Sequence, residues 1–171
     1  EADLFDLPFE AAYFDHLFVC HLLEHQVEPA SGLKAIRKHL KPGGTVTVFE
    51  GDHGSCYFYP PREDALMAWN CLIEVQRRLG ANSLIGRELF PLITDAGFAQ
   101  VRVEPKMVYI DQSRPELMES FVHKTIIPMV EGVRDNALEM DLIDASTWHN
   151  GISDLHRIRH LETGIFCYTF F

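Results

Sequence analysis

The stretch Phe14-Asp15-His16-Leu17-Phe18-Val19-Cys20 indicates the fold class of this chain. It is a short, continuously apolar run that follows an acidic boundary, and such a run predicts a strand buried on both faces. A buried central strand is typical of a layered α/β architecture.

The segments that follow this strand predict a helix and then a second strand. A helix begins near Pro29 and Ser31, and its apolar side chains Leu33, Ile36 and Leu40 lie on one stripe. Lys41-Pro42-Gly43-Gly44 is expected to end that helix, and Thr45 to Phe49 is the next strand. Strand, helix and strand within roughly 35 residues predict a βαβ unit with parallel strands.

The remainder of the chain continues the alternation of helices and strands. We expect helices over 61–79, near 89–93 and over most of 114–161, and strands over 100–110 and 163–171. Neither a linker nor an internal repeat divides the 171 residues, so the sequence predicts one domain over 1–171.

Composition and charge exclude several classes of protein and partner. Fifteen Lys and Arg face 25 Asp and Glu, a net charge of −10, which argues against nucleic acid and anionic membrane surfaces as partners. No apolar run approaches the ~18 residues of a membrane span, and the first residues lack the basic start of a signal peptide. The cysteines form no C-x-x-C pair and sit in apolar surroundings, which suggests reduced, buried thiols in a cytoplasmic protein: Cys20, Cys56, Cys71 and Cys167.

Four pieces within the first fifty residues share the order and spacing of a known family. They are Asp3-Leu4-Phe5-Asp6-Leu7-Pro8-Phe9, Phe14-Asp15, Leu22-Leu23-Glu24-His25 and Leu40-Lys41-Pro42-Gly43-Gly44. In these pieces the chain resembles a class I S-adenosylmethionine-dependent methyltransferase of the small-molecule branch. The resemblance implies a Rossmann-like methyltransferase fold, S-adenosylmethionine as cofactor, and methyl transfer to a small-molecule acceptor by in-line displacement.

The resemblance extends to the last residue but does not include the usual N-terminal part of the family. Glu50 to Gly54, Asn82 to Gly86 and Gly164 to Phe171 also look like the small-molecule branch. Such enzymes begin with a strand, a G-x-G-x-G loop and a second strand that ends in an acid, and none of these is present here. The resemblance therefore implies the C-terminal part of a longer methyltransferase, with helices inserted before the last strand.

Four residues are candidates for contact with the cofactor. The resemblance implies that Asp3 and Leu4 meet the adenine; the alternative is a solvated terminus. Cys20 and His21 lie where the first strand ends, and ligands of parallel α/β sheets bind at the carboxyl ends of the strands. The alternatives for this pair are a buried thiol and a polar loop residue.

Glu50, Asp52 and His53 are the catalytic candidates. They follow the second strand and are expected at the same sheet edge as His21, facing the acceptor. A histidine or a carboxylate there could take a proton from an oxygen or nitrogen nucleophile during its methylation. The alternative is an ordinary turn in which Asp52 is a cap.

A metal site is not expected. His21 and His25 are four residues apart and would share a helix face, with Asp52 or His53 as a third ligand. However, the chain lacks the H-E-x-x-H order that places a base beside a metal. A metal-dependent hydrolase that uses His21, His25 and Asp52 is kept as a minor alternative.

The helical segment 113–161 is a candidate lid. Apolar and polar side chains that could line it include Phe121, Thr125, Met129 and Trp148, and a lid would exclude water from the reaction. The alternative is that these side chains are plain core.

The principal alternative to an enzyme is a noncatalytic structural or dimerising module.

In the family's sheet the strand that contains Leu17 to Cys20 pairs with a first strand that is absent here, and it has no Lys or Pro to protect its edge. We therefore expect a homodimer, with the edge near Phe18 at the contact.

Overall fold

The structure is a computed structural model that describes residues 2–171, and the chain forms two compact units. The first unit comprises the residues up to Asp52 together with 80–106 and 170–171, and the second comprises 53–79 and 107–169. Both units mix helices and strands, so the α/β prediction is confirmed.

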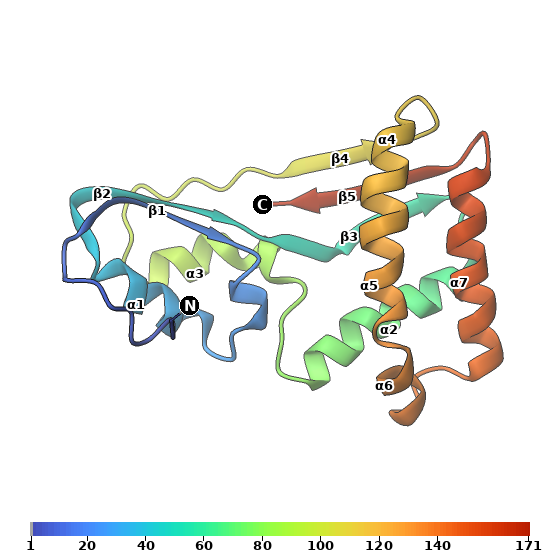
Figure 1. The fold of residues 1–171 in the computed structure, drawn as a ribbon, viewed down its shortest axis with the longest axis horizontal. Coiled ribbons are helices and arrows are strands. Elements are labelled where there is room, and N and C mark those ends of the chain that lie inside the picture. Colours follow the sequence, from blue (N-terminus) through green and yellow to red (C-terminus); the bar gives the residue numbers. More distant parts are fainter. Residues whose placement is uncertain (1) are drawn as a thin grey trace. The chain divides into compact units, whose positions relative to one another are not determined.

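The first unit is built on a strand–helix–strand segment (Figure 1). Its elements are β1 (Phe14–Cys20), the 3-10 turn η1 (Leu23–His25), α1 (Pro29–Arg37), β2 (Leu40–Phe49), the 3-10 turn η2 (Ile85–Glu88) and α3 (Leu89–Asp95). β1 and β2 are parallel, with His16 opposite Thr45 and Cys20 opposite Phe49. The predicted βαβ unit is confirmed.

The Lys41-Pro42-Gly43-Gly44 segment does not end the helix, as the sequence suggested, but belongs to β2. α1 already ends at Arg37. Phe14 pairs with Leu40 and His16 with Thr45, so the four intervening residues of β2 form a bulge opposite a single residue of β1. Gly43 has a φ of 80°, a conformation that a bulge needs and that glycine adopts without strain.

The core of the first unit lies on one side of the parallel pair. Figure 1 shows α1 and α3 on the same side of β1 and β2. The buried residues of this core are Val19, Leu23, Leu33, Ile36, Ile85, Leu89, Ile93 and Ala96. The prediction that β1 is buried on both faces is wrong: Val19 points into the core, but Phe18 is 64% exposed, because successive strand residues face opposite sides.

A strand follows β2 that the sequence did not suggest. β3 (Gly51–Tyr59) is separated from β2 by Glu50 alone and includes Asp52 and His53, for which a turn was the alternative. Between the two strands, the backbone N–H of Glu50 donates to the carbonyl of Phe171 at 3.0 Å, and the N–H of Phe171 donates back at 2.9 Å. Pairing with residues more than a hundred positions away thus keeps a glycine-rich segment extended.

The second unit carries the sheet β3-β5-β4 and most of the helices. Its elements besides β3 are α2 (Glu63–Arg78), β4 (Lys106–Ile110), α4 (Pro115–Leu117), the π-helix η3 (Met118–Ile126), α5 (Ile127–Glu131), α6 (Arg134–Glu139), α7 (Ala145–His160) and β5 (Ile165–Phe170). The helical character of 114–161 and the final strand are confirmed, whereas only 106–110 of the predicted strand 100–110 is a strand.

The candidate lid forms part of the packing of the second unit. Trp148 is buried, and the ring of Phe121 lies 5.9 Å from that of Tyr168 in an edge-to-face contact. Whether this segment also acts as a lid stays a prediction.

All four cysteines are free, as expected. The expected burial holds for Cys71 and Cys167 but is wrong for Cys20, whose position at the end of β1 leaves it exposed. Burial raises the pKa of the Cys56 thiol, and the neighbouring Cys167 raises it further. Among residues 2–171, no helix combines the length and the apolar character that crossing a bilayer requires.

Candidate functional site

His21 directly follows β1 in a strained backbone conformation. Its φ is 48°, in the left-handed region that residues other than glycine seldom adopt, and its N–H donates to the carbonyl of Phe49 at 3.0 Å. The imidazole meets the rings of Phe49 and Phe170 edge-on, at centroid distances of 5.5 and 5.7 Å. Strained residues held by their surroundings concentrate at functional sites.

Glu50 follows β2 and is fully buried. Its Oε1 accepts hydrogen bonds from the N–H groups of Leu22 (2.9 Å) and Leu23 (2.8 Å). Its Oε2 is buried and has no hydrogen-bond partner in the described part of the chain. Glu50 therefore ties the end of β2 to the loop after β1 and leaves one carboxylate oxygen unsatisfied.

Glu24 lies in η1 and is nearly buried beside two histidines. Its Oε1 is 3.8 Å from Nδ1 of His21 and 3.5 Å from Nε2 of His25. Burial raises the pKa of the Glu24 carboxyl; the charge of Glu50 raises it as well, while His25 and His21 oppose the shift.

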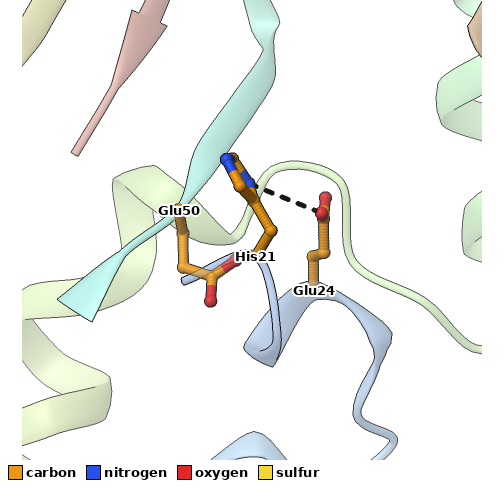
Figure 2. A group of neighbouring side chains, drawn as sticks. All are labelled: His21, Glu24 and Glu50. Atoms are coloured by element: carbon orange, nitrogen blue, oxygen red, sulfur yellow. Dashed lines mark ion pairs between the residues drawn. The ribbon is translucent and has the colours of Figure 1, made fainter. Parts of the chain in front are cut away.

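Figure 2 shows that His21, Glu24 and Glu50 come together where the two parallel strands end. One potential ligand atom from each lies within 4.8 Å of the others. The expected sharing of a helix face by His21 and His25 is wrong, because His21 precedes η1 and has a left-handed φ. The third member of the group is Glu50, which the sequence reasoning had assigned to the acceptor, and not Asp52 or His53.

Asp52 is buried and holds Arg87 in a two-pronged ion pair. Asp52 Oδ2 accepts from Nε of Arg87 and Oδ1 accepts from Nη2, both at 2.8 Å. This hydrogen bonding raises the pKa of the Arg87 guanidinium. Sequence reasoning missed Arg87; the only signal was a charged residue in the short helical segment between Leu84 and Leu89.

His53 belongs to the second unit and is buried. Its Nδ1 is 2.6 Å from the phenol oxygen of Tyr168, and its carbonyl accepts a hydrogen bond from Trp69 Nε1 at 2.9 Å. The three catalytic candidates thus have separate partners: backbone amides for Glu50, a guanidinium for Asp52 and a phenol for His53. Their predicted roles stay predictions.

The cofactor candidates lie in two places of the first unit. Cys20 and His21 are exposed at the carboxyl end of β1. Asp3 Oδ1 accepts from the N–H of Phe5 at 2.9 Å, and Leu4 packs against α1 so closely that a Cβ at Gly32 would lie 2.9 Å from its Cδ2. The structure therefore brings Cys20 and His21 together and places Asp3 and Leu4 in the N-terminal segment.

Residues 1–48 match the family model described as a methyltransferase domain. A putative methyltransferase from Bacillus halodurans C-125 is similar in structure, with a TM-score of 0.50 and 14% sequence identity over 99% of this chain and 68% of that protein. The first 48 residues are thus similar to a methyltransferase domain, and the chain shares the fold of that protein. The resemblance that the first fifty residues indicated is confirmed, and so is the Rossmann-like fold.

Two further similar proteins are longer than this chain. An uncharacterized 37.1 kDa protein in transposon Tn4556 of Streptomyces fradiae is 33% identical over 103 residues, which are 60% of this chain and 29% of that protein. Phosphoethanolamine N-methyltransferase 2 of Haemonchus contortus, in complex with phosphomonomethylethanolamine and S-adenosylhomocysteine, has a TM-score of 0.43 and 14% identity over 98% of this chain and 35% of that enzyme. The chain thus spans about a third of the length of these two proteins.

Proposed function

We propose that this chain serves S-adenosylmethionine-dependent methyl transfer to a small-molecule acceptor. The observation that carries the proposal is the parallel pair β1 and β2, which lies within the family-matched residues 1–48 up to its last residue, Phe49. The carboxyl ends of these strands gather Cys20, His21 and Glu50. This is the sheet edge at which α/β proteins bind ligands.

The residues at this edge and in the N-terminal segment fit parts of the cofactor. The Asp3 carboxylate is exposed and suits the amino group of the adenine, and Leu4 offers an apolar side chain to the ring. Cys20 belongs to the last residue pair of the parallel strands and His21 follows it; both are exposed, so a ligand can reach both. When bound, S-adenosylmethionine supplies an electrophilic methyl group on a sulfonium ion.

The chain's own residues would position the acceptor and handle its proton. In-line displacement needs an aligned nucleophile from which water is excluded. In the proposed mechanism His53 takes the acceptor proton, and the phenol oxygen of Tyr168, 2.6 Å from Nδ1, orients the imidazole. Glu50 fixes the loop at Leu22 and Leu23, and Asp52 keeps Arg87 in place.

Isothermal titration with S-adenosylhomocysteine tests the proposal, with the longer protein and residues 1–171 measured side by side. We expect the longer protein to bind, and the shorter chain to bind at least ~100-fold more weakly, a loss of about 2.7 kcal/mol, because it lacks the glycine loop and the ribose-binding acid. Asp3→Asn in the longer protein should weaken binding further, whereas Asp15→Asn, on the exposed start of β1, should not. A longer protein that binds no cofactor would instead support a noncatalytic, dimerising module.

A further inference from the structure

The group formed by His21, Glu24 and Glu50 has the composition of a metal site. It offers one imidazole nitrogen and two carboxylates, and one atom from each residue lies within 4.8 Å of the others. Metal–ligand bonds of about 2.0–2.2 Å place neighbouring ligand atoms about 3–4 Å apart, so contraction by about 1 Å closes the shell.

The buried carboxylate of Glu50 has an oxygen without a hydrogen-bond partner, which a bound cation would satisfy. Glu50 has no exposed surface, its Oε1 is saturated by the N–H groups of Leu22 and Leu23, and its Oε2 has no partner among residues 2–171. Leaving a buried carboxylate oxygen unpaired costs free energy, and a second, nearly buried carboxylate beside it adds repulsion. The histidine–glutamate contacts of Glu24 account for that residue but not for Glu50 Oε2.

The group is also held in place before any ligand arrives. Two backbone N–H groups orient Glu50, and the carbonyl of Glu24 accepts a hydrogen bond from the N–H of Asn82 at 2.8 Å. The His21 imidazole packs edge-on against the stacked rings of Phe49 and Phe170, its backbone is strained, and its side chain is 45% exposed. Supporting contacts of this kind orient metal ligands, and the exposed imidazole gives an ion a route of entry.

We propose that His21, Glu24 and Glu50 bind a divalent transition-metal ion such as Zn²⁺. An imidazole with two carboxylates favours such an ion over Mg²⁺ or Ca²⁺, which prefer oxygen ligands alone. Three protein ligands leave a coordination position open for water or a ligand oxygen. The site does not depend on the proposed methyl transfer, so either can fail without the other.

Zinc titration of the metal-free chain tests the site. Isothermal titration calorimetry should give one Zn²⁺ per chain, with Mg²⁺ bound more weakly. His21→Asn and Glu24→Gln should each weaken Zn²⁺ binding by ~10–100-fold or more, the loss seen when metal-site contacts are removed. Asparagine tolerates the left-handed backbone at position 21, so this variant should stay folded, which circular dichroism checks.

Matched controls separate this site from adventitious binding. His25→Ala removes the neighbouring imidazole, and Glu28→Gln removes an exposed carboxylate that makes no capping hydrogen bond; both should keep the affinity within about twofold. Glu50 is not substituted, because Glu50→Gln risks unfolding the chain. Thermal melting gives a second measurement on the other variants: Zn²⁺ should raise the Tm of the parent chain and of both controls but not of His21→Asn. Binding that is absent, tighter for Mg²⁺, or equal in His21→Asn and the controls would overturn the proposal.

Discussion

Asp52 and Arg87 form an asymmetric ion pair, in which the carboxylate is buried and the guanidinium side chain is 48% exposed. Both oxygens of Asp52 accept hydrogen bonds of 2.8 Å from the guanidinium, a planar arrangement that lysine cannot reproduce. Removal of the partner leaves a buried carboxylate without its main counter-charge, which costs more than the loss of an exposed pair.

We therefore expect Arg87→Ala to lower the free energy of unfolding by about 1–3 kcal/mol, the cost of a buried charged group that loses its hydrogen bonds, discounted for the solvent around Arg87. Arg87→Lys should recover only part of the loss. Urea unfolding at neutral pH measures the effect, with Arg102→Ala, an exposed arginine of the same unit, as the control. Equal midpoints for Arg87→Ala and Arg102→Ala would show that Asp52 needs no counter-charge.

His53 is the residue on which the proposed chemistry depends most. In the longer, active protein, His53→Ala should lower kcat/KM by roughly 10²-fold while the affinity for S-adenosylhomocysteine changes little. Tyr168→Phe should lower kcat/KM less and displace its dependence on pH, because the phenol orients Nδ1. If turnover survives in His53→Ala, His53 is a core residue of β3 held by Trp69 and Tyr168.

The edge of β1 is the predicted contact of a homodimer. In the described residues β1 pairs with β2 on one side only, and Phe18 is 64% exposed. We expect Phe18→Lys to move sedimentation at high micromolar concentration from dimer to monomer, because a charge blocks strand addition. Phe90→Lys, at another exposed phenylalanine of the same unit, should leave the dimer unchanged. A parent chain that sediments as a monomer rules the contact out.

Glu74 gives a prediction about pH. Hydrogen bonds from Arg77 and Arg78 lower the pKa of the Glu74 carboxyl from 4.5 to about 2. A lowered pKa in the folded state stabilises the protein above pH 4.5, and that stabilisation is lost as the pH falls toward 2. Glu74→Gln should thus lower the Tm near neutral pH, and the difference from the parent should shrink toward about pH 3. Glu139→Gln, at an exposed glutamate of α6, should show no such dependence.

The sequence predicted the elements whose local pattern and long-range pairing agree. The apolar run at Phe14–Cys20, the stripe of α1 and the aromatic run of β5 form the expected structures. β3 was not predicted, because Gly51 and Gly54 are typical of a turn. Its strand conformation depends on pairing with β5, far along the chain. The bulge at Lys41–Gly44 was not predicted for a similar reason. A loop between a helix and a strand has the same Pro- and Gly-rich composition as a bulge.

The sequence predicted where in the fold the candidate site lies, but not which contacts its side chains make. The rule that ligands bind at the carboxyl ends of parallel strands led to His21 and Glu50. It could not reveal that Glu50 turns toward the loop at Leu22 and Leu23, because this depends on the left-handed backbone at His21. The ion pair of Arg87 could not be predicted either, since its partner Asp52 lies 35 positions away in the sequence.

A substitution at Gly151 tests how closely α7 packs on α2 within the second unit. A glycine in the middle of a helix is less favourable than alanine by about 1 kcal/mol, so Gly→Ala ordinarily stabilises a helix. Here an added Cβ would meet the carbonyl oxygen of Asp64 and lie 2.9 Å from the Cβ of Ala68, so the two helices would have to move apart. Overpacking of this kind costs about 1–3 kcal/mol and reverses the sign expected from helix propensity.

We expect Gly151→Ala to lower the Tm, by about 2–4 °C for each kcal/mol lost in a domain of this size. Asn150→Ala, at the exposed neighbouring position of α7, should leave the Tm unchanged or raise it slightly, because alanine favours the helix and touches nothing new. Thermal melting of the two variants beside the parent chain separates the effects. If Gly151→Ala melts at or above the parent temperature, helix propensity outweighs the crowding, and α2 and α7 do not need their close approach.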